Sequence, residues 1–375
     1  MRSTCRLKTG RDGFAGMRDN ASYAFARLLR DKRTLMQDLP SPCLRMGILG
    51  AANIARSFVA GVAASSTVKV TAVASRDRAK AIRFAKDTGV RCACGSYEEL
   101  LADPTIDAIY NPLPNSLHAE WSIRAIEAGK HVLCEKPLAA TANEARAMFA
   151  AARHHSVTLV EGFPYRAQPH AIKLKELVDS GVIGHLQSIQ AAFGFTVPRA
   201  EDIRFDPTLA GGALMDAGTY PVSLVRLLAG ERPTRVFAAA RWHATGVDQT
   251  LMASLEHPNG LLAQISCSLA TGLHRQALIA GTAGVIQTTF LNFPPLDRPA
   301  VLNLKRGVSW DEPYETIEVP AVDGFRAEAE SFERLIRFGP DHWTGATPEE
   351  SVDIMLTLEA ILQSARTRKL IEVAG

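Results

Sequence analysis

Three segments of the chain carry side chains that could do chemistry as one site. They are the glycine turn at Gly50, the residues around Lys136, and the pair Asp216 and Tyr220. A glycine turn that opens a helix can offer backbone N–H groups to phosphates. A lysine can polarise a carbonyl group, and a tyrosine hydroxyl can transfer a proton. Together these segments indicate hydride exchange between a bound nicotinamide dinucleotide and an alcohol or carbonyl compound.

The glycine turn fits the dinucleotide-binding fingerprint with one departure. Gly50 is the first glycine of that pattern, Ala52 replaces the second, and Ala55 takes the third place. The methyl group of Ala52 hinders the approach of backbone to pyrophosphate, but the helix N-terminus can still bind it. A glycine turn before any buried helix could look alike, and the position after a first strand favours binding. The expected cofactor contacts here are Gly50, Ala51, Ala52, Asn53 and Ile54.

The end of the second predicted strand indicates which dinucleotide binds. An NAD site would place Asp or Glu there to bond the ribose 2′-hydroxyl. The strand ends instead in Ser75 and Arg76, a small donor and a cation suited to a 2′-phosphate. Arg76 could also simply face solvent, and Asp77 could be the NAD residue, although its place before a helix fits an N-cap. We therefore favour NADP(H) as the cofactor, with NAD as the alternative.

The residues Glu135 and Lys136 follow a short apolar strand, 131–134. Doubly wound sheets hold their ligands at the carboxyl ends of such strands. Pro137 excludes Lys136 from helical geometry and permits a cis bond, so the lysine side chain can be aimed. The alternative is an ordinary surface lysine at the end of a strand, but the nearby dinucleotide motif favours a functional role for Lys136. We expect both Glu135 and Lys136 at the cofactor.

Asp216 and Tyr220 are four residues apart, so one face of a helix would carry both. On that face they would meet Lys136 across a cleft. Taken alone, such a pair is more often a capping aspartate and a core tyrosine. Beside Lys136, Tyr220 is a candidate for proton transfer, with its pKa lowered by the cation. Asp216 would orient either the substrate hydroxyl or Lys136.

The order of predicted elements explains how these segments could meet. From residue 44 to 162, short apolar strands alternate with helices. This alternation predicts βαβ units and hence an α/β fold, a doubly wound parallel sheet of the Rossmann type covered on both faces. The strands are expected at 45–49, 68–74, 107–110, 131–134 and 157–160.

The pattern changes after residue 162. Helices at 168–179 and within 211–229 precede closely spaced strands, which predicts an α+β domain with an open, mostly antiparallel sheet over residues 163–375. Two helices end the chain, and the last can pack back on the Rossmann domain. Residues 1–43 are polar and are expected to form a poorly ordered arm. The strands of the second domain are expected at 235–242, 250–255, 261–268, 276–280 and 285–289.

Composition and charge exclude several classes of partner. The chain has 375 residues, 47% of them hydrophobic, and a net charge of +3. This small charge lacks the positive excess typical of proteins that bind nucleic acid or an anionic membrane, and the apolar runs are too short for a membrane span. Six cysteines are scattered, and the close pair Cys92 and Cys94 has no second pair to complete a metal site. We expect free thiols, a cytoplasmic location and no metal.

Five segments match a family pattern in their order. They are Gly50-Ala51-Ala52-Asn53-Ile54-Ala55, Tyr110-Asn111-Pro112-Leu113-Pro114-Asn115-Ser116-Leu117-His118, Glu135-Lys136-Pro137, Glu161-Gly162-Phe163-Pro164-Tyr165-Arg166 and Gly211-Gly212-Ala213-Leu214-Met215-Asp216-Ala217-Gly218-Thr219-Tyr220-Pro221. On these segments the chain from Leu44 to Leu370 resembles the glucose-fructose oxidoreductase/inositol dehydrogenase family. With Tyr220 in place of histidine, it is similar to the NADP-dependent sugar oxidoreductases of that family, such as xylose dehydrogenases, dihydrodiol dehydrogenases and sugar 3-ketoreductases.

The resemblance implies roles for individual residues. The family's lysine falls on Lys136, and its Asp-x-x-x-Tyr element on Asp216 and Tyr220. The resemblance alone implies two further sets of residues. One is a loop that lies along the cofactor, and the other is a pair of residues that border the cofactor or the substrate. These positions are Pro112, Leu113, Asn115 and His118 for the loop, and Tyr165 and Arg166 for the pair. The resemblance also implies a sugar-like substrate and a homodimer or homotetramer formed through the C-terminal sheet.

The resulting hypothesis is an NADP(H)-dependent oxidoreductase acting on a sugar carbonyl or alcohol. Two alternatives stay open. One is a non-catalytic NADPH-binding regulator with the same fold, against which the intact set of Lys136, Asp216 and Tyr220 argues. The other is an NAD-dependent glycosidase of the same family, against which the Ser75-Arg76 pair argues.

Overall fold

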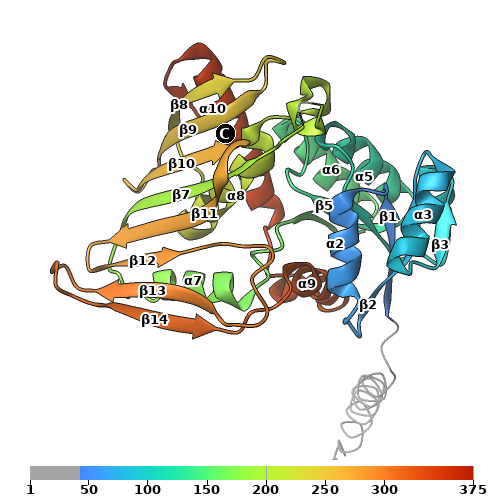
Figure 1. Ribbon diagram of the computed structural model, residues 1–375, viewed down its shortest axis with the longest axis horizontal. Helices are drawn as coiled ribbons and strands as arrows, with labels where there is room; N and C mark the ends of the chain where they lie inside the picture. Colours follow the sequence, from blue (N-terminus) through green and yellow to red (C-terminus); the bar gives the residue numbers. More distant parts are fainter. Residues whose placement is uncertain (1–42, 200, 375) are drawn as a thin grey trace, which may run out of the picture. The chain divides into compact units, whose positions relative to one another are not determined.

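The computed structural model describes residues 43–199 and 201–374, so the predicted arm, apart from Cys43, lies outside the described residues. From Leu44 onward the chain forms one compact unit. Figure 1 shows its two sheets, the smaller one formed by the first part of this unit and the larger one by the second. The boundary predicted at residue 162 stays a prediction, because the two parts are not separate units.

The first sheet has six parallel strands in the order β3-β2-β1-β4-β5-β6. The predicted doubly wound sheet is confirmed, and β3 is an edge strand that the sequence analysis did not predict. The strands are β1 (Leu44–Leu49), β2 (Val68–Ala74), β3 (Cys92–Cys94), β4 (Ala108–Asn111), β5 (His131–Glu135) and β6 (Leu159–Gly162). The helices between them are α2 (Asn53–Val62), α3 (Arg78–Thr88), α4 (Tyr97–Leu101), α5 (His118–Glu127) and α6 (Ala142–His154).

Both faces of this sheet are buried. Strand β1 shows this, since successive residues of a strand point to opposite faces of the sheet. On β1, Ile48 belongs to an apolar cluster with Phe58 of α2, whereas Leu49 belongs to a second cluster with Trp121 of α5. The turn after β1 needs glycine at position 50, since its φ is +92° and a Cβ there would lie 3.0 Å from a methyl carbon of Leu113. The predicted first glycine thus sets the tight turn into α2.

The second sheet has nine strands in the order β14-β13-β12-β11-β7-β10-β9-β8-β15. Only the pair β7 and β10 is parallel, so the predicted open, mostly antiparallel sheet is confirmed. The predicted strands correspond to β8 (Arg235–Trp242), β9 (Asp248–Glu256), β10 (Leu262–Ser268), β11 (Ala270–Gly281) and β12 (Gly284–Thr288). The strands not predicted are β7 (Leu186–Thr196), β13 (Ala300–Arg306), β14 (Tyr314–Val319) and β15 (Ile371–Glu372).

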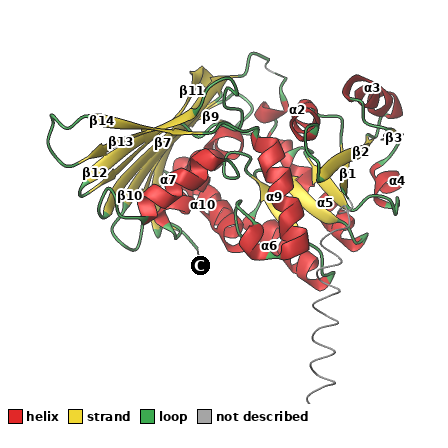
Figure 2. Ribbon diagram, turned by 90° about the horizontal axis from the view of Figure 1, so that it is seen from below, coloured by secondary structure: helices red, strands yellow, loops and turns green. Residues whose placement is uncertain are grey.

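Helices cover one face of the second sheet and leave the other open (Figure 2). They are α7 (Pro169–Asp179), α8 (Thr219–Ala229) and α10 (Pro348–Thr367). A further helix, α9 (Gly324–Phe338), packs against α2 of the first sheet, where Phe325 meets Phe58 edge-on with ring centroids 5.8 Å apart. The last helix, α10, contacts α8 and also α6, where Glu359 accepts a hydrogen bond from the Ala142 backbone at 2.8 Å. The last helix, α10, therefore joins the two sheets, whereas α9 packs on the first.

Within residues 43–199 and 201–374, no helix is long and apolar enough to cross a membrane. Nor does this part of the chain hold a cluster of three or more His, Cys, Asp or Glu side chains that could bind a metal ion.

Candidate active site

A cavity of about 860 Å³ lies at the carboxyl ends of β1, β4 and β5, next to the turn before α8 and the start of β11. Its volume is within the range of small-molecule sites, roughly 300–1,000 Å³. Below, we call this cavity the cleft. It brings together most of the predicted site residues: Ala51, Ala52, Asn53, Ile54, Pro112, Leu113, Asn115, His118, Glu135, Lys136, Asp216 and Tyr220.

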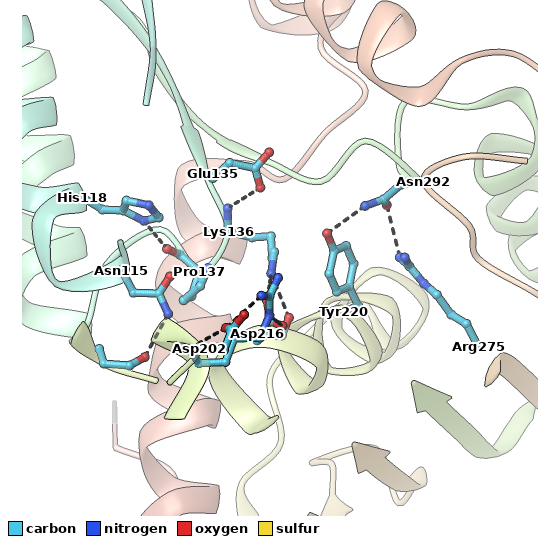
Figure 3. Close-up of polar contacts among 12 residues, drawn as sticks. Asn115, His118, Glu135, Lys136, Pro137, Asp202, Asp216, Tyr220, Arg275 and Asn292 are labelled. Atoms are coloured by element: carbon cyan, nitrogen blue, oxygen red, sulfur yellow. Dashed lines mark hydrogen bonds and ion pairs between the residues drawn. The ribbon is translucent and has the colours of Figure 1, made fainter. Parts of the chain in front are cut away.

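Lys136 and Asp216 form an ion pair in the wall of the cleft (Figure 3). Lys136 Nζ lies 2.9 Å from Asp216 Oδ1 and also donates to the Asp216 backbone oxygen at 2.8 Å. Arg204 Nε donates to the other carboxylate oxygen, Oδ2, at 2.6 Å. Burial opposes ionisation of Asp216, but the two cations outweigh it and lower the pKa of Asp216 to about 2. Both charges of the pair therefore persist at neutral pH, and Lys136 is held at a fixed place.

Tyr220 lies directly beside this pair. Lys136 Nζ is 4.9 Å from the centroid of the Tyr220 ring, and Asn292 Nδ2 donates to Tyr220 Oη at 2.8 Å. Burial raises the pKa of Tyr220 above its ordinary value, and the Lys136 and Arg275 charges offset only part of that rise. Lys136 thus lowers the pKa of Tyr220 as expected, but the residue is only 5% exposed, so desolvation outweighs the cations and the net pKa is raised.

The turn that carries Asp216 is a π-helical segment, η4 (Leu214–Gly218), which runs directly into α8. Asp248 of β9 anchors its start, since Asp248 Oδ2 accepts the Leu214 N–H at 2.7 Å. Gly212 makes this approach possible: its φ is +119°, and a Cβ there would lie 2.3 Å from Asp248 Oδ1. Widened turns of this kind are frequent at functional sites. Here the turn places both Asp216 and Tyr220 on the wall of the cleft.

The loop predicted to lie along the cofactor also fixes the residues around Lys136. The buried ring of His118 bridges two carbonyl oxygens, those of Pro137 at 2.8 Å and Leu113 at 2.7 Å. Burial lowers the pKa of His118 to about 4, so the neutral ring donates to one of them at pH 7. Asn115 Nδ2 donates to the Ala210 oxygen at 2.9 Å, which ties the loop to the turn before α8.

Glu135 faces the cleft from the end of β5 and is 7% exposed. The Tyr110 hydroxyl donates to Glu135 Oε1 at 2.5 Å. Burial raises the pKa of Glu135, although Lys136 and this hydrogen bond oppose the rise. A carboxyl group therefore lines the cleft at the end of β5, and its contact with the cofactor stays a prediction.

A second cavity of about 370 Å³ adjoins the cleft, and both are lined by Ala51, Ala52, Pro112, Leu113 and Pro114. It is lined by the predicted residues Gly50, Ser75 and Arg76, and also by Lys80. Asp77 serves as the N-cap of α3, where its carboxylate accepts the N–H groups of Ala79 and Lys80 at 2.9 and 3.2 Å. The residue weighed as an NAD determinant is thus engaged in capping.

Two predicted residues do not line either cavity, and their expected place is corrected here. Tyr165 is 1% exposed, and its hydroxyl lies 3.0 Å from Ser223 Oγ in the core; burial raises its pKa to about 12. Arg166 is 3% exposed and donates to both carboxylate oxygens of Glu350, at 2.9 and 3.0 Å. The turn after β6 directs both side chains toward α8 and α10, where the Tyr165 hydroxyl and Arg166 Nη2 find partners, whereas Arg166 Nε and Nη1 are buried without a hydrogen-bond partner.

Sequence reasoning missed several side chains of the cleft, including three polar ones that contact Asp216 or Tyr220. Arg204 pairs with Asp216 but lies outside the five segments that carry the family resemblance. Arg275 and Asn292 also line the cleft, from β11 and from the segment after β12. Neither of these two belongs to a motif; strand pairing brings Arg275 to Tyr220, and the loop after β12 brings Asn292 there.

Fold and site together define a class: a Rossmann oxidoreductase with a lysine, aspartate and tyrosine at the dinucleotide cleft. Two family models match the chain. Residues 44–163 match an oxidoreductase family with an NAD-binding Rossmann fold, and residues 171–287 match the GFO/IDH/MocA C-terminal domain. The chain belongs to this family of oxidoreductases, which confirms the resemblance inferred from its motifs.

Relatives with known names are similar over most of the chain. The D-xylose 1-dehydrogenase (NADP(+)) 2 of Haloferax volcanii is 38% identical over 88% of this chain and 100% of its own length. A dTDP-3,4-didehydro-2,6-dideoxy-alpha-D-glucose 3-reductase of Saccharopolyspora spinosa is 34% identical over 86% of this chain and 96% of its own.

Solved structures agree in fold. A 3-ketoreductase from Actinomadura kijaniata, in complex with NADP and TDP-benzene, superposes with a TM-score of 0.79. It is 32% identical and covers 86% of this chain and 98% of its own. Levoglucosan dehydrogenase in complex with NADH and levoglucosan has a TM-score of 0.80 at 23% identity, over 88% of this chain and 100% of its own, which is a likeness of fold.

Proposed function

We propose that the protein is an NADP(H)-dependent oxidoreductase that exchanges hydride between nicotinamide and the carbonyl or alcohol group of a sugar or sugar-derived compound. The observation that carries the proposal is the contact of Lys136 with both Asp216 and the Tyr220 ring in the wall of the cleft. The substrate class is supported by the relatives, which include a xylose dehydrogenase and a deoxysugar 3-reductase.

The residues present fit the dinucleotide. Ala52 precedes α2 without a side-chain cap, so the first N–H groups of that helix are available to the pyrophosphate beside the Gly50 turn. Ser75, Arg76 and Lys80 line the adjoining cavity and would hold a 2′-phosphate, since two cations and a hydroxyl suit that group. NADP(H) is therefore the proposed cofactor. When bound, its nicotinamide supplies or accepts the hydride.

Tyr220 is the proposed proton-transfer group. In oxidation the phenolate oxygen of Tyr220 accepts the proton of the substrate hydroxyl, and in reduction the Tyr220 hydroxyl donates its proton to the carbonyl oxygen. Lys136 contributes a fixed positive charge where the substrate oxygen gains negative charge. Asp216 acts on Lys136, because its carboxylate oxygens are already occupied by Lys136 and Arg204.

The open face of the second sheet supports a proposal on assembly. The side chains that line a hollow on this face are uncharged, as in the central part of many protein interfaces. They include the exposed residues Gln190, Met252, Gln264, Gln276, Gln287 and Val301. We propose a homodimer or homotetramer through this face, and Met252→Arg should shift the mass in analytical ultracentrifugation toward the monomer. A cytoplasmic location is proposed from the scattered cysteines of the sequence alone.

The test is a screen of NADP reduction over aldoses, vicinal diols and sugar alcohols, run in parallel with NAD. The expected result is turnover of at least one sugar or diol with a preference for NADP. Tight NADPH binding with no turnover of any compound would favour the regulator instead. Release of sugar from a glycoside in the presence of NAD would favour the glycosidase.

A further inference from the structure

Tyr220 has a second set of neighbours on the side away from Lys136. Figure 3 shows Tyr220 between the Lys136–Asp216 pair and two further residues, Arg275 of β11 and Asn292 of the loop after β12. The guanidinium carbon of Arg275 lies 4.0 Å from the centroid of the Tyr220 ring. Asn292 Nδ2 donates to Tyr220 Oη at 2.8 Å, and Arg275 donates to Asn292 Oδ1 at 3.3 Å.

These contacts fix the direction of the hydrogen bonds. A guanidinium has donors and no acceptor, so the Asn292 atom that faces Arg275 must be the amide oxygen. The amide nitrogen then faces Tyr220, and the Tyr220 oxygen accepts a hydrogen bond from it. The tyrosine's own O–H cannot point at Asn292 and is left for the cleft, which Tyr220 lines. Arg275 thereby determines, through one amide, where the Tyr220 proton points.

Arg275 is placed in a way that a purely structural arginine rarely is. It is 9% exposed, and its Nε has no hydrogen-bond partner. Among the residues that the structure describes, no Asp or Glu forms an ion pair or hydrogen bond with it, and the ionisable groups that act on it are the hydroxyls of Tyr220 and Tyr165. The rings of Phe193 and Phe290 lie 4.7 and 4.8 Å from its guanidinium carbon. A buried cation without a carboxylate favours negative charge on the nearest ionisable group, the Tyr220 hydroxyl.

The backbone of Asn292 is anchored, so its amide is held in place. Gln168 Nε2 donates to the carbonyl oxygens of Leu291 and Asn292 at 2.7 and 3.0 Å. Gly324 packs against the same point, where an added Cβ would lie 2.5 Å from the Asn292 oxygen. Asn292 itself is 7% exposed. This anchoring removes the freedom that an asparagine in a loop would otherwise have.

We propose that Arg275 and Asn292 are positioning residues for the reaction: Arg275 orients the Asn292 amide, which holds the Tyr220 oxygen as an acceptor, directs its proton into the cleft and stabilises its phenolate form. This inference rests on the proposed role of Tyr220 in proton transfer. It explains why a buried arginine without a carboxylate partner lies next to the reacting group.

The pH dependence of Tyr220 has several contributors besides Arg275. Lys136 and Glu135 face it from the end of β5, and burial acts against its ionised form. The other titratable groups around it are Tyr110 of β4, Tyr165 after β6 and Asp216 of the preceding turn. All of these groups are kept when Asn292 or Arg275 is replaced. A shift in the limb of the pH–rate profile that reports the ionisation of Tyr220 therefore reports on the replaced residue.

The main test is Asn292→Leu, which keeps the volume and removes both hydrogen bonds. We expect kcat to fall by about 10- to 100-fold, the range for a lost hydrogen bond to a charged group. The pH limb assigned to Tyr220 should move to higher pH by about one unit or more, because the phenolate has lost its donor. NADPH affinity by fluorescence and KM should stay within a few-fold of wild type. An unshifted pH limb with wild-type kcat would overturn the proposal.

A second set of variants approaches the pair from Arg275. Arg275→Met keeps an unbranched side chain among the aromatic rings and should shift the same limb in the same direction. Arg275→Lys, which keeps the charge, should restore part of kcat. Arg306→Met is the matched control, since its exposed ion pair with Glu315 lies far along the sheet on β13, and it should behave as wild type. Normal kcat and pH profile in folded Arg275→Met would contradict the proposal even if Asn292→Leu did not fold.

The double variant with Tyr220→Phe separates this inference from the proposed function. In the Tyr220→Phe background, Asn292→Leu should cost little more, since residues that act through one group are not additive. A full additional loss there would mean that Asn292 acts on the substrate directly, which overturns the positioning role. Near wild-type turnover of Tyr220→Phe alone would instead refute the role of Tyr220 and with it the proposed function.

Discussion

The ion pair between Lys136 and Asp216 gives the sharpest quantitative expectation. Asn at position 216 keeps the shape of the side chain and removes the charge that both Lys136 and Arg204 contact. The pKa of Asp216, about 2, is roughly two units below the ordinary value of about 3.9. At about 1.4 kcal/mol per pKa unit, that difference corresponds to about 2.5 kcal/mol of folding stability at neutral pH.

Asp216→Asn should therefore lower the free energy of unfolding by about 2.5 kcal/mol, measured by urea denaturation at pH 7. For a chain of this size that is a fall in Tm of roughly 3 °C. The kcat should fall by about 100-fold, because Lys136 loses the partner that holds it beside Tyr220. The matched control is Asp179→Asn, which breaks the exposed pair with Lys175 on α7. An exposed pair of this type contributes only about 0.3–0.5 kcal/mol.

Equal stability losses in Asp216→Asn and Asp179→Asn would refute the reasoning, since they would show that burial adds nothing to the pair in the cleft. Wild-type kcat in a folded Asp216→Asn variant would refute the assignment of Asp216 as the group that holds Lys136.

Three further predictions follow from the site. Arg76→Ala should raise the Kd for NADP by about 10- to 100-fold and leave that for NAD within about threefold; an equal loss for both cofactors would remove the case for NADP. Tyr165→Phe should cost about 1 kcal/mol of stability through the lost contact with Ser223, yet keep near wild-type kcat, whereas a large loss of kcat would return Tyr165 to the reacting groups. The stability that Asp216 contributes should be fully present above about pH 4 and vanish as the pH falls toward 2, so wild type and Asp216→Asn should converge in acid denaturation; a constant gap would contradict the lowered pKa.

Much of the first sheet could be predicted because local signals decide its elements. The capping box of Thr141 and Glu144 is present at the start of α6, and Asp77 caps α3 as expected. The strand β7 was missed although it lies in the middle of the second sheet. Its sequence mixes Gln, Ala and Gly with few β-branched residues, so propensity gave little signal, and its place is determined by pairing with β10 and β11.

The residues of the site also divide into those that local motifs predict and those that only tertiary packing brings together. Lys136, Asp216 and Tyr220 belong to short motifs, so their meeting could be proposed before the fold was known. Arg275 reaches Tyr220 because β11 pairs with β7 in a register that includes an irregularity between Ala270 and His274. No pattern in the sequence sets that register, and a shift by one residue would turn Arg275 to the other face of the sheet. Such contacts follow from tertiary packing alone.

The most direct test of the account is the turnover of Tyr220→Phe with the best substrate, measured beside its affinity for NADPH. The variant keeps the ring and its packing and lacks only the hydroxyl assigned to proton transfer. We predict that kcat falls by about 10²–10⁴-fold while NADPH binding stays within a few-fold of wild type. Near wild-type turnover in a variant that still binds NADPH would contradict the central claim that Tyr220 transfers the proton.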